Sequence, residues 1–161
     1  MKEPEFIIEI FLRPGEWHWG DTDTRIRTIL GSCVALCFWH PKLKIGGMCH
    51  YLLPSRRSKT ESDPFDGKYG EEALEMMLEA MKTSKTAPKD YHLKIFGGAN
   101  MFSDIIPDGG INVGKKNIEL AESIAAKYGF SLQAKNVGGI GHRSILLDLW
   151  SGDVWLKKPK E

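Results

Sequence analysis

Two short apolar runs, each entered through glycine, constrain the fold of this chain more than any other feature. The first occupies residues 30–37, Leu-Gly-Ser-Cys-Val-Ala-Leu-Cys, and the second residues 46–54, Gly-Gly-Met-Cys-His-Tyr-Leu-Leu-Pro. The stretch between them contains Pro41, Lys42 and Lys44, which are typical of a connecting turn. We therefore expect two neighbouring strands joined by a turn.

Such a pair of strands can bring the thiol of Cys33 beside the imidazole of His50. A cysteine becomes an effective nucleophile when a neighbouring base or cation stabilises its thiolate, so these two side chains suffice for acyl transfer. Gly31 leaves the backbone uncovered just upstream, and the N–H groups near Ser32 and Cys33 are candidates for an oxyanion hole. One interpretation of the pattern is therefore nucleophilic attack on an amide carbon.

Two other interpretations compete with a catalytic thiol. A cysteine in an apolar strand is more often an inert core residue, and a histidine beside such a run is often simply packed and hydrogen-bonded. A zinc site is the second alternative, because ligand types are present at Cys33, Cys37, Cys49, His40 and His50. However, no C-x-x-C pair occurs, and adjacent Cys49 and His50 project to opposite faces of a strand. We expect no metal site.

Composition narrows the class of protein. At 161 residues the chain is expected to form a single domain, residues 1–161, with its own core. Lys and Arg number 22 against 21 Asp and Glu, and this balance argues against a nucleic-acid partner. The start of the chain lacks the apolar segment of a secretory signal, and no run approaches the ~20 apolar residues that span a bilayer. We expect a cytoplasmic protein without membrane insertion, whose three cysteines include a free thiol.

The remaining periodicity predicts an α+β fold, with a mixed β-sheet or β-sandwich core flanked by two main helices. One helix is expected from residue 70, where Leu74, Met77 and Met81 form an apolar stripe. The second is expected after Asn112, a suitable N-cap, and should stop at Gly129. Beyond the two central runs, strands are expected at residues 6–12, 25–30, 91–96, 132–137, 144–150 and 154–157.

Several connecting segments contain further candidates. Residues 54–68 have no hydrophobic period and should form a long surface loop, which either recognises substrate or is merely solvated. Residues 17–19, Trp-His-Trp, are expected in a loop. Its tryptophans either form a partner-facing patch or a lid over the site or, as we favour, fold back on the core. The glycines at 97–98 should line the cleft or brace the catalytic strands. His142 is a second candidate base, and Arg143 could pair with a carboxylate of the substrate or partner.

Ordered motifs make the chain resemble the CheD family of bacterial chemotaxis proteins. The two apolar runs carry Leu-Gly-Ser-Cys-Val-Ala and Gly-Gly-Met-x-His-x-x-Leu-Pro. Three further motifs follow in the expected order: Gly-Gly-Ala-x-Met-Phe at 97–102, Asn-Val-Gly-x-x-Asn at 112–117, and Val-Gly-Gly at 137–139 with Arg143. Together they cover nearly the whole chain, which makes the resemblance specific.

The resemblance implies an activity, a site and partners. Proteins of that family are chemoreceptor glutamine deamidases, which convert particular receptor glutamines to glutamates with a cysteine and a histidine at the positions of Cys33 and His50. For such a pair we expect a thioester mechanism that needs no cofactor. The resemblance also implies a core similar to that of the toxin-type cysteine deamidases. Two partners are implied: the cytoplasmic helical domain of chemoreceptors and, in systems that contain it, the CheC phosphatase.

A third residue usually orients the base in such sites, and in the CheD family a threonine just upstream of the cysteine is assigned this role. The family pattern can place it six residues before the cysteine, where this chain has Arg27, whereas Thr28 lies five before. A shift of one residue in a strand moves a side chain to the other face unless a bulge intervenes. Thr28 is the candidate for this third catalytic position.

Two other function classes stay open at this point. The chain could act as a noncatalytic chemotaxis adaptor that binds receptors or the CheC phosphatase. It could instead transfer the acyl group to an amine, as a transglutaminase does, because the same thioester serves hydrolysis and transfer.

Overall fold

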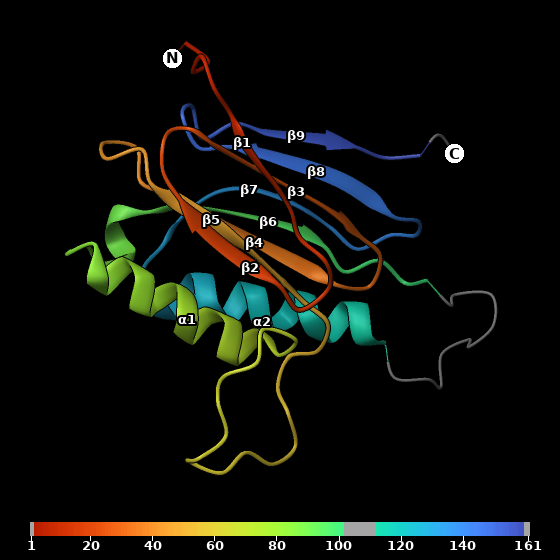
Figure 1. Ribbon diagram of the computed structural model, residues 1–161. Helices are drawn as coiled ribbons and strands as arrows, with labels where there is room; N and C mark the ends of the chain where they lie inside the picture. Colours follow the sequence, from red (N-terminus) through yellow and green to blue (C-terminus); the bar gives the residue numbers. More distant parts are fainter. Residues whose placement is uncertain (1, 102–111, 160–161) are drawn as a thin grey trace.

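A computed structural model describes residues 2–101 and 112–159 of the chain. The described residues form two β-sheets and two α-helices stacked in layers (Figure 1), so the predicted α+β fold is confirmed. The strands are β1 (Ile8–Phe11), β2 (Trp17–Gly20), β3 (Thr24–Leu30), β4 (Val34–Trp39), β5 (Gly46–Tyr51), β6 (His92–Gly97), β7 (Ser131–Val137), β8 (Arg143–Asp148) and β9 (Val154–Lys157). The helices are α1 (Gly70–Thr83) and α2 (Val113–Tyr128), and a short 3₁₀ turn lies at Pro88–Asp90.

Both sheets are mixed. The larger one has the strand order β2-β5-β4-β6-β7, in which only the β6–β7 pair is parallel. The smaller one has the order β1-β3-β8-β9, in which only the β1–β3 pair is parallel. Strands β4 and β5, formed by the two apolar runs, are direct neighbours near the centre of the larger sheet, as predicted.

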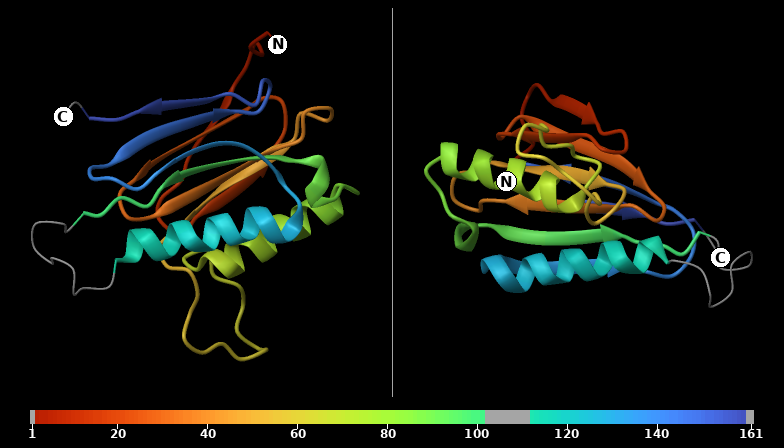
Figure 2. Two further views of the ribbon diagram at one scale, coloured as in Figure 1. Left: turned by 180° about the vertical axis from the view of Figure 1, so that it is seen from behind. Right: turned by 90° about the horizontal axis from the view of Figure 1, so that it is seen from below.

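The five-stranded sheet is the middle layer of the molecule. Both helices cover one of its faces and the four-stranded sheet covers the other, as the front and rear views show (Figures 1 and 2). Two hydrophobic cores result, and β4 contributes to both because successive side chains point to opposite faces. Val34 and Leu36 pack toward the helices, whereas Ala35 and Cys37 pack between the sheets. A strand buried on both sides explains why its sequence is continuously apolar.

The two helices follow the predicted patterns. In α1, Leu74, Met77 and Met81 are buried against the sheet. At the start of α2, the Asn112 side chain accepts a hydrogen bond from the N–H of Lys115 at 2.9 Å, which is an N-cap. The helix ends at Gly129, whose φ of 78° is a left-handed conformation that glycine adopts without strain.

One expected loop is a strand. Residues 17–19 belong to β2, the edge strand of the larger sheet. It pairs antiparallel with β5, and Trp17 lies opposite Cys49. The run is only four residues long, so its pattern alone was too short to predict a strand, and the partner strand decides its conformation. The expectation that its aromatic side chains reach the core holds for Trp19, which packs against the cluster under the helices, but not for Trp17, which is exposed.

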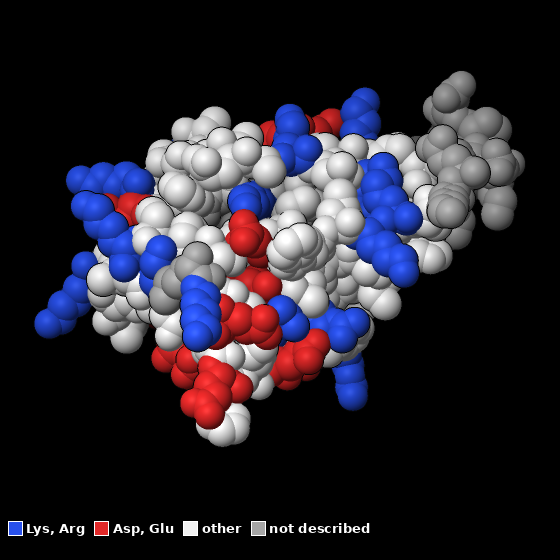
Figure 3. All heavy atoms as spheres, turned by 90° about the horizontal axis from the view of Figure 1, so that it is seen from above, with Lys and Arg blue, Asp and Glu red and all other residues white. Residues whose placement is uncertain are grey.

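The outer face of the four-stranded sheet carries charges of both signs. Arg25 binds Asp148 at 2.7 Å and Arg27 binds Glu9 at 3.0 Å across its strands. Figure 3 looks onto this side and shows Lys and Arg interspersed with Asp and Glu, with no continuous basic surface among the residues described. No helix within residues 2–101 and 112–159 is long and apolar enough to cross a membrane.

Candidate active site

The strand register brings Cys33 and His50 to the same side of the larger sheet. Ala35 in β4 lies opposite His50 in β5, and Cys33 directly precedes β4. Because alternate residues share a face, Cys33 and Ala35 both point into the core between the two sheets. His50 points the same way, since it contacts a residue of the smaller sheet, while adjacent Cys49 packs toward the helices. The predicted alternation of these side chains is therefore confirmed.

Thr28 supplies that contact from the smaller sheet. It lies on the inward face of β3, is only 1% exposed, and its Oγ1 is 2.7 Å from Nδ1 of His50. The same hydroxyl donates its single proton to the carbonyl oxygen of Leu12 at 2.8 Å. It must then accept from His50, so Nδ1 carries the proton and Nε2 carries the lone pair. Arg27, six residues before the cysteine, is instead half exposed and paired with Glu9.

The lone pair on His50 is buried and unengaged. Nε2 has no hydrogen-bond partner among the described residues, although buried polar atoms are normally satisfied. Burial lowers the pKa of His50 from 6.5 to about 4, so the imidazole is neutral near pH 7. The result is a neutral base, held in one tautomer, whose accepting atom makes no hydrogen bond to the described residues.

Of the three free cysteines, Cys33 is the accessible one. It is partly exposed, whereas Cys37 and Cys49 are buried in the two cores. Burial raises the pKa of Cys33 above its usual value, and raises that of Cys49 to about 12. With a neutral imidazole and a raised thiol pKa, the resting pair is thiol and imidazole rather than an ion pair.

A glycine turn braces the backbone around Cys33, as predicted for residues 97–98. The N–H of Gly98 donates to the carbonyl oxygen of Cys33 at 2.8 Å, and the N–H of Ala99 donates to that of Gly31 at 3.0 Å. Gly97 has a φ of 109°, and a Cβ there would overlap the carbonyl oxygen of Cys33. This close approach explains why the turn begins with two glycines.

Arg143 supports that turn and does not await a partner carboxylate, so the sequence-based expectation for it is wrong. Its guanidinium is almost fully buried and donates to the carbonyl oxygens of Gly97 (3.3 Å) and Gly138 (2.6 Å) and to Oδ1 of Asn136 (2.8 Å). Burial lowers its pKa. His142, the second candidate base, is exposed.

Asn117 hydrogen-bonds two neighbouring backbone segments, a structural role that is open to an asparagine in this motif. It sits on the buried stripe of α2, and its Nδ2 donates to the carbonyl oxygens of both Ser32 (3.0 Å) and Leu52 (2.8 Å). The backbone carbonyl oxygen of Asn117 accepts from the hydroxyl of Tyr51 at 2.6 Å. One side chain thus ties the residue before Cys33 to the segment that follows His50. In the sequence, the signal for this role is the position of Asn117 on the apolar stripe of the helix, because a buried asparagine needs hydrogen-bond partners.

The other cysteines and the other histidine considered for zinc do not join Cys33 and His50 in one cluster. Cys37 packs between the sheets, Cys49 packs under the helices, and Nδ1 of His40 accepts from the N–H of Leu43 at 3.1 Å. Within residues 2–101 and 112–159, no group of three or more His, Cys, Asp or Glu side chains is placed to hold a metal.

Sequence comparison identifies the family. The family model described as CheD chemotactic sensory transduction matches residues 52–158. A probable chemoreceptor glutamine deamidase CheD 3 from Dechloromonas aromatica is 43% identical over 158 residues, which is 98% of this chain and 91% of that protein. This chain belongs to the CheD family. The resemblance seen in its motifs is confirmed.

Other CheD relatives agree along the whole chain. The probable chemoreceptor glutamine deamidase CheD of Pseudomonas syringae pv. tomato is 45% identical, over 98% of this chain and 93% of its own length. The CheD 1 protein of Leptospira interrogans serovar Lai is 38% identical, over 98% and 97%. A crystal structure of a Neisseria meningitidis protein of family DUF152 aligns at a TM-score of 0.43 and 13% identity, over 77% of this chain and 53% of that one. That likeness is too distant to bear on the activity of CheD.

Burial of a neutral His50 predicts how the stability of this CheD protein depends on pH. The histidine binds a proton near pH 6.5 when the chain is unfolded and near pH 4 when it is folded. Its contribution is therefore complete above pH 6.5 and is lost as the pH falls toward 4, by about 3 kcal/mol in total. Urea unfolding of wild type and His50→Asn between pH 7 and 4 should show the steeper loss in wild type. Equal slopes for the two proteins would contradict a buried, neutral histidine.

Proposed function

We propose that this protein deamidates glutamine side chains of chemoreceptors, converting them to glutamates and releasing ammonia. The observation that supports it best is the Thr28–His50 hydrogen bond, which leaves the lone pair of Nε2 on the face that His50 shares with Cys33. The names of the relatives agree with this activity. The chain would then work on the cytoplasmic helical domain of the receptor, as a cytoplasmic protein.

The proposed reaction begins with proton transfer from Cys33. Nε2 of His50 takes the proton of the thiol while Sγ attacks the carbon of the glutamine carboxamide. The carboxamide oxygen becomes negative, and the backbone N–H groups of Ser32 and Cys33, next to Gly31, are proposed to stabilise it. His50 then protonates the departing nitrogen, the C–N bond breaks, and ammonia leaves a thioester on Sγ.

Hydrolysis of the thioester completes the cycle. His50 accepts a proton from a water molecule whose oxygen attacks the thioester carbon, and the C–S bond breaks. The proton returns to Sγ, which regenerates the thiol of Cys33 and releases a glutamate side chain. Each proton is carried by His50, so the reaction uses no cofactor.

Thr28 is proposed to fix the tautomer of His50, which a conservative pair of variants tests. Thr28→Ser keeps the hydroxyl and should retain most of the activity. Thr28→Val keeps the shape but removes the acceptor for Nδ1–H, so the proton is no longer directed away from Nε2. We expect kcat for Thr28→Val to fall about tenfold to a hundredfold, with little change in KM. Steady-state deamidation rates measure this, and equal rates for the two variants would argue against the role.

The activity itself is tested by incubating a chemoreceptor cytoplasmic fragment, shown to be a substrate of another CheD protein, with the wild-type chain. Intact-mass and ammonia analysis should show amide-to-acid conversion matched by released ammonia. Alkylating the protein beforehand should stop the reaction, and peptide mapping should locate the label on Cys33, the accessible cysteine. If no ammonia is released, the noncatalytic adaptor becomes the preferred function. Incorporation of an added primary amine would instead indicate transglutaminase chemistry.

A further inference from the structure

The long loop of residues 54–68 is rooted at the active site. Leu52, just before the loop, is held by the same Asn117 amide that binds the carbonyl oxygen of Ser32. The N–H of Leu52 also donates to the carbonyl oxygen of Lys68 at 2.8 Å, which joins the two ends of the loop. The base of the loop is therefore coupled to the backbone next to Cys33.

A second contact joins the loop to the histidine. Gly67 is buried against the turn at Gly15, where a Cβ on Gly67 would overlap the carbonyl oxygen of Gly15. The N–H of Gly15 in turn donates to the carbonyl oxygen of His50 at 2.7 Å. Both ends of the loop thus contact backbone that positions the catalytic pair, while its tip extends away from the body of the molecule (Figure 1).

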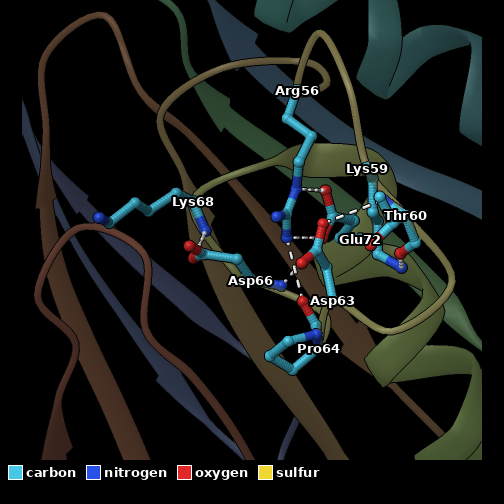
Figure 4. A network of polar contacts seen from close by, with 8 residues as sticks. All are labelled: Arg56, Lys59, Thr60, Asp63, Pro64, Asp66, Lys68 and Glu72. Atoms are coloured by element: carbon cyan, nitrogen blue, oxygen red, sulfur yellow. Dashed lines mark hydrogen bonds and ion pairs between the residues drawn. The ribbon is translucent and has the colours of Figure 1, made fainter.

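An ion pair organises the interior of the loop. The guanidinium of Arg56 forms a two-point contact with the carboxylate of Glu72 on α1, with Nε 2.7 Å from Oε2 and Nη2 bonded to Oε1 (Figure 4). Nη2 also donates to the carbonyl oxygen of Pro64 at 3.0 Å, and the N–H of Asp66 donates to Oε1 of Glu72 at 3.0 Å. The side chains of Glu72 and Arg56 are only 8% and 20% exposed. A two-point contact between a guanidinium and a carboxylate fixes the relative orientation of the two side chains in addition to their electrostatic attraction.

Apart from this ion pair, the interior of the loop is held by short-range hydrogen bonds, such as those between Thr60 and Asp63. Gly67 is the one buried residue between 54 and 68, so hydrophobic packing contributes little to the order of this segment. Without such packing, the entropy of a free loop favours many conformations. The contacts of Arg56 and Glu72 join the two limbs of the loop to each other and to α1, and they therefore select one of these conformations.

The selected conformation leaves apolar side chains exposed at and beyond the root of the loop. Phe65 is 50% exposed with the Nζ of Lys59 4.9 Å from its ring centroid, and Leu53 is 42% exposed. A small amide is large enough to contact Cys33 and His50 only. A glutamine within a folded protein brings a wider surface, which could also cover Phe65 and Leu53.

We propose that the Arg56–Glu72 ion pair is a positioning element for docking of the protein substrate. It holds loop 54–68 in the shape that presents Phe65, together with Leu53 at the root of the loop, to the polypeptide surrounding the target glutamine. The role rests on the proposed deamidase function and concerns binding, because Arg56 and Glu72 bond to the loop and α1 rather than to Cys33 or His50.

The test separates binding from chemistry with two conservative variants. Glu72→Gln keeps the shape of the side chain without its charge, and Arg56→Lys keeps the charge without the fork. With a chemoreceptor cytoplasmic fragment as substrate, we expect KM to rise about tenfold as the competent loop conformation becomes rarer. We expect kcat and the rate of Cys33 alkylation by iodoacetamide to change by less than about twofold. Trypsin should cleave the loop faster in both variants, at Arg57 or Lys59.

Two further proteins make the result decisive. Glu9→Gln removes a different ion pair, the one with Arg27 on the outer face of the smaller sheet, and should leave KM unchanged. Phe65→Ala leaves the ion pair intact and should raise KM. If Glu72→Gln and Phe65→Ala release ammonia normally and their KM is unchanged, the docking role is overturned while the deamidase function stands. The same conclusion follows if these variants lose kcat and keep their KM. Absence of ammonia release by the wild type would overturn the deamidase function and the docking role together.

Discussion

Replacement of Cys33 by alanine is expected to remove deamidation of the receptor fragment, with a loss of about 10⁴-fold or more in kcat. The reason is that no thioester can form without Sγ, and removal of a nucleophile typically leaves only the residual effect of binding and oxyanion contacts. The change deletes one partly exposed sulfur atom, so the fold should be retained. Intact-mass analysis of the receptor fragment over a long incubation measures the residual rate.

Cys37→Ala is the matched control for this loss. Cys37 lies on the same face of the sheet, four residues further along, but is buried between the sheets with a raised pKa. Its removal should cost stability of about 1–2 kcal/mol through the cavity it leaves, while deamidation persists. Substantial conversion by Cys33→Ala, or an equal loss in Cys37→Ala, would contradict Cys33 as the nucleophile and favour the adaptor.

The local part of this site is predictable from the sequence. Glycine-bounded apolar runs predicted the β4–β5 pair, and alternation of side chains predicted that Cys33 and His50 would share a face while Cys49 would not. The helix boundaries followed from Asn112 and Gly129, because capping depends on neighbouring residues. In each case the information lies within a few residues of the feature.

The long-range part of the site is not predictable in the same way. Thr28 comes from the other sheet, and its contact with His50 depends on how two sheets stack, which no local pattern encodes. Arg143 was expected at a carboxylate of the substrate or partner, but two carbonyl oxygens of the glycine turns and the side chain of Asn136 in β7 satisfy it internally. Asn117 likewise joins two segments that are distant in the chain. These polar residues are buried because tertiary packing brings acceptors to them.

Replacement of His50 by asparagine is expected to lower kcat by about 10²- to 10⁴-fold, the usual contribution of a positioned general base. Asparagine can still place an N–H near the hydroxyl of Thr28, so the hydrogen bond that crosses the sheets has a substitute. What it lacks is a basic atom in place of Nε2. The thiol of Cys33 must then lose its proton to solvent before attack, and burial already raises its pKa.

The pH dependence distinguishes loss of a base from general damage. In the wild type, kcat/KM should fall only as the pH drops through the His50 pKa of about 4, since protonation removes the lone pair, and should be level above about pH 5. In His50→Asn, activity should instead rise about tenfold per pH unit with the thiolate fraction, up to the pKa of Cys33. His142→Gln, which alters the exposed second candidate, should keep the wild-type profile. Two results would show that another group accepts the thiol proton. One is an activity of His50→Asn that does not change with pH, and the other is a fall in kcat of His142→Gln as large as the one expected for His50→Asn.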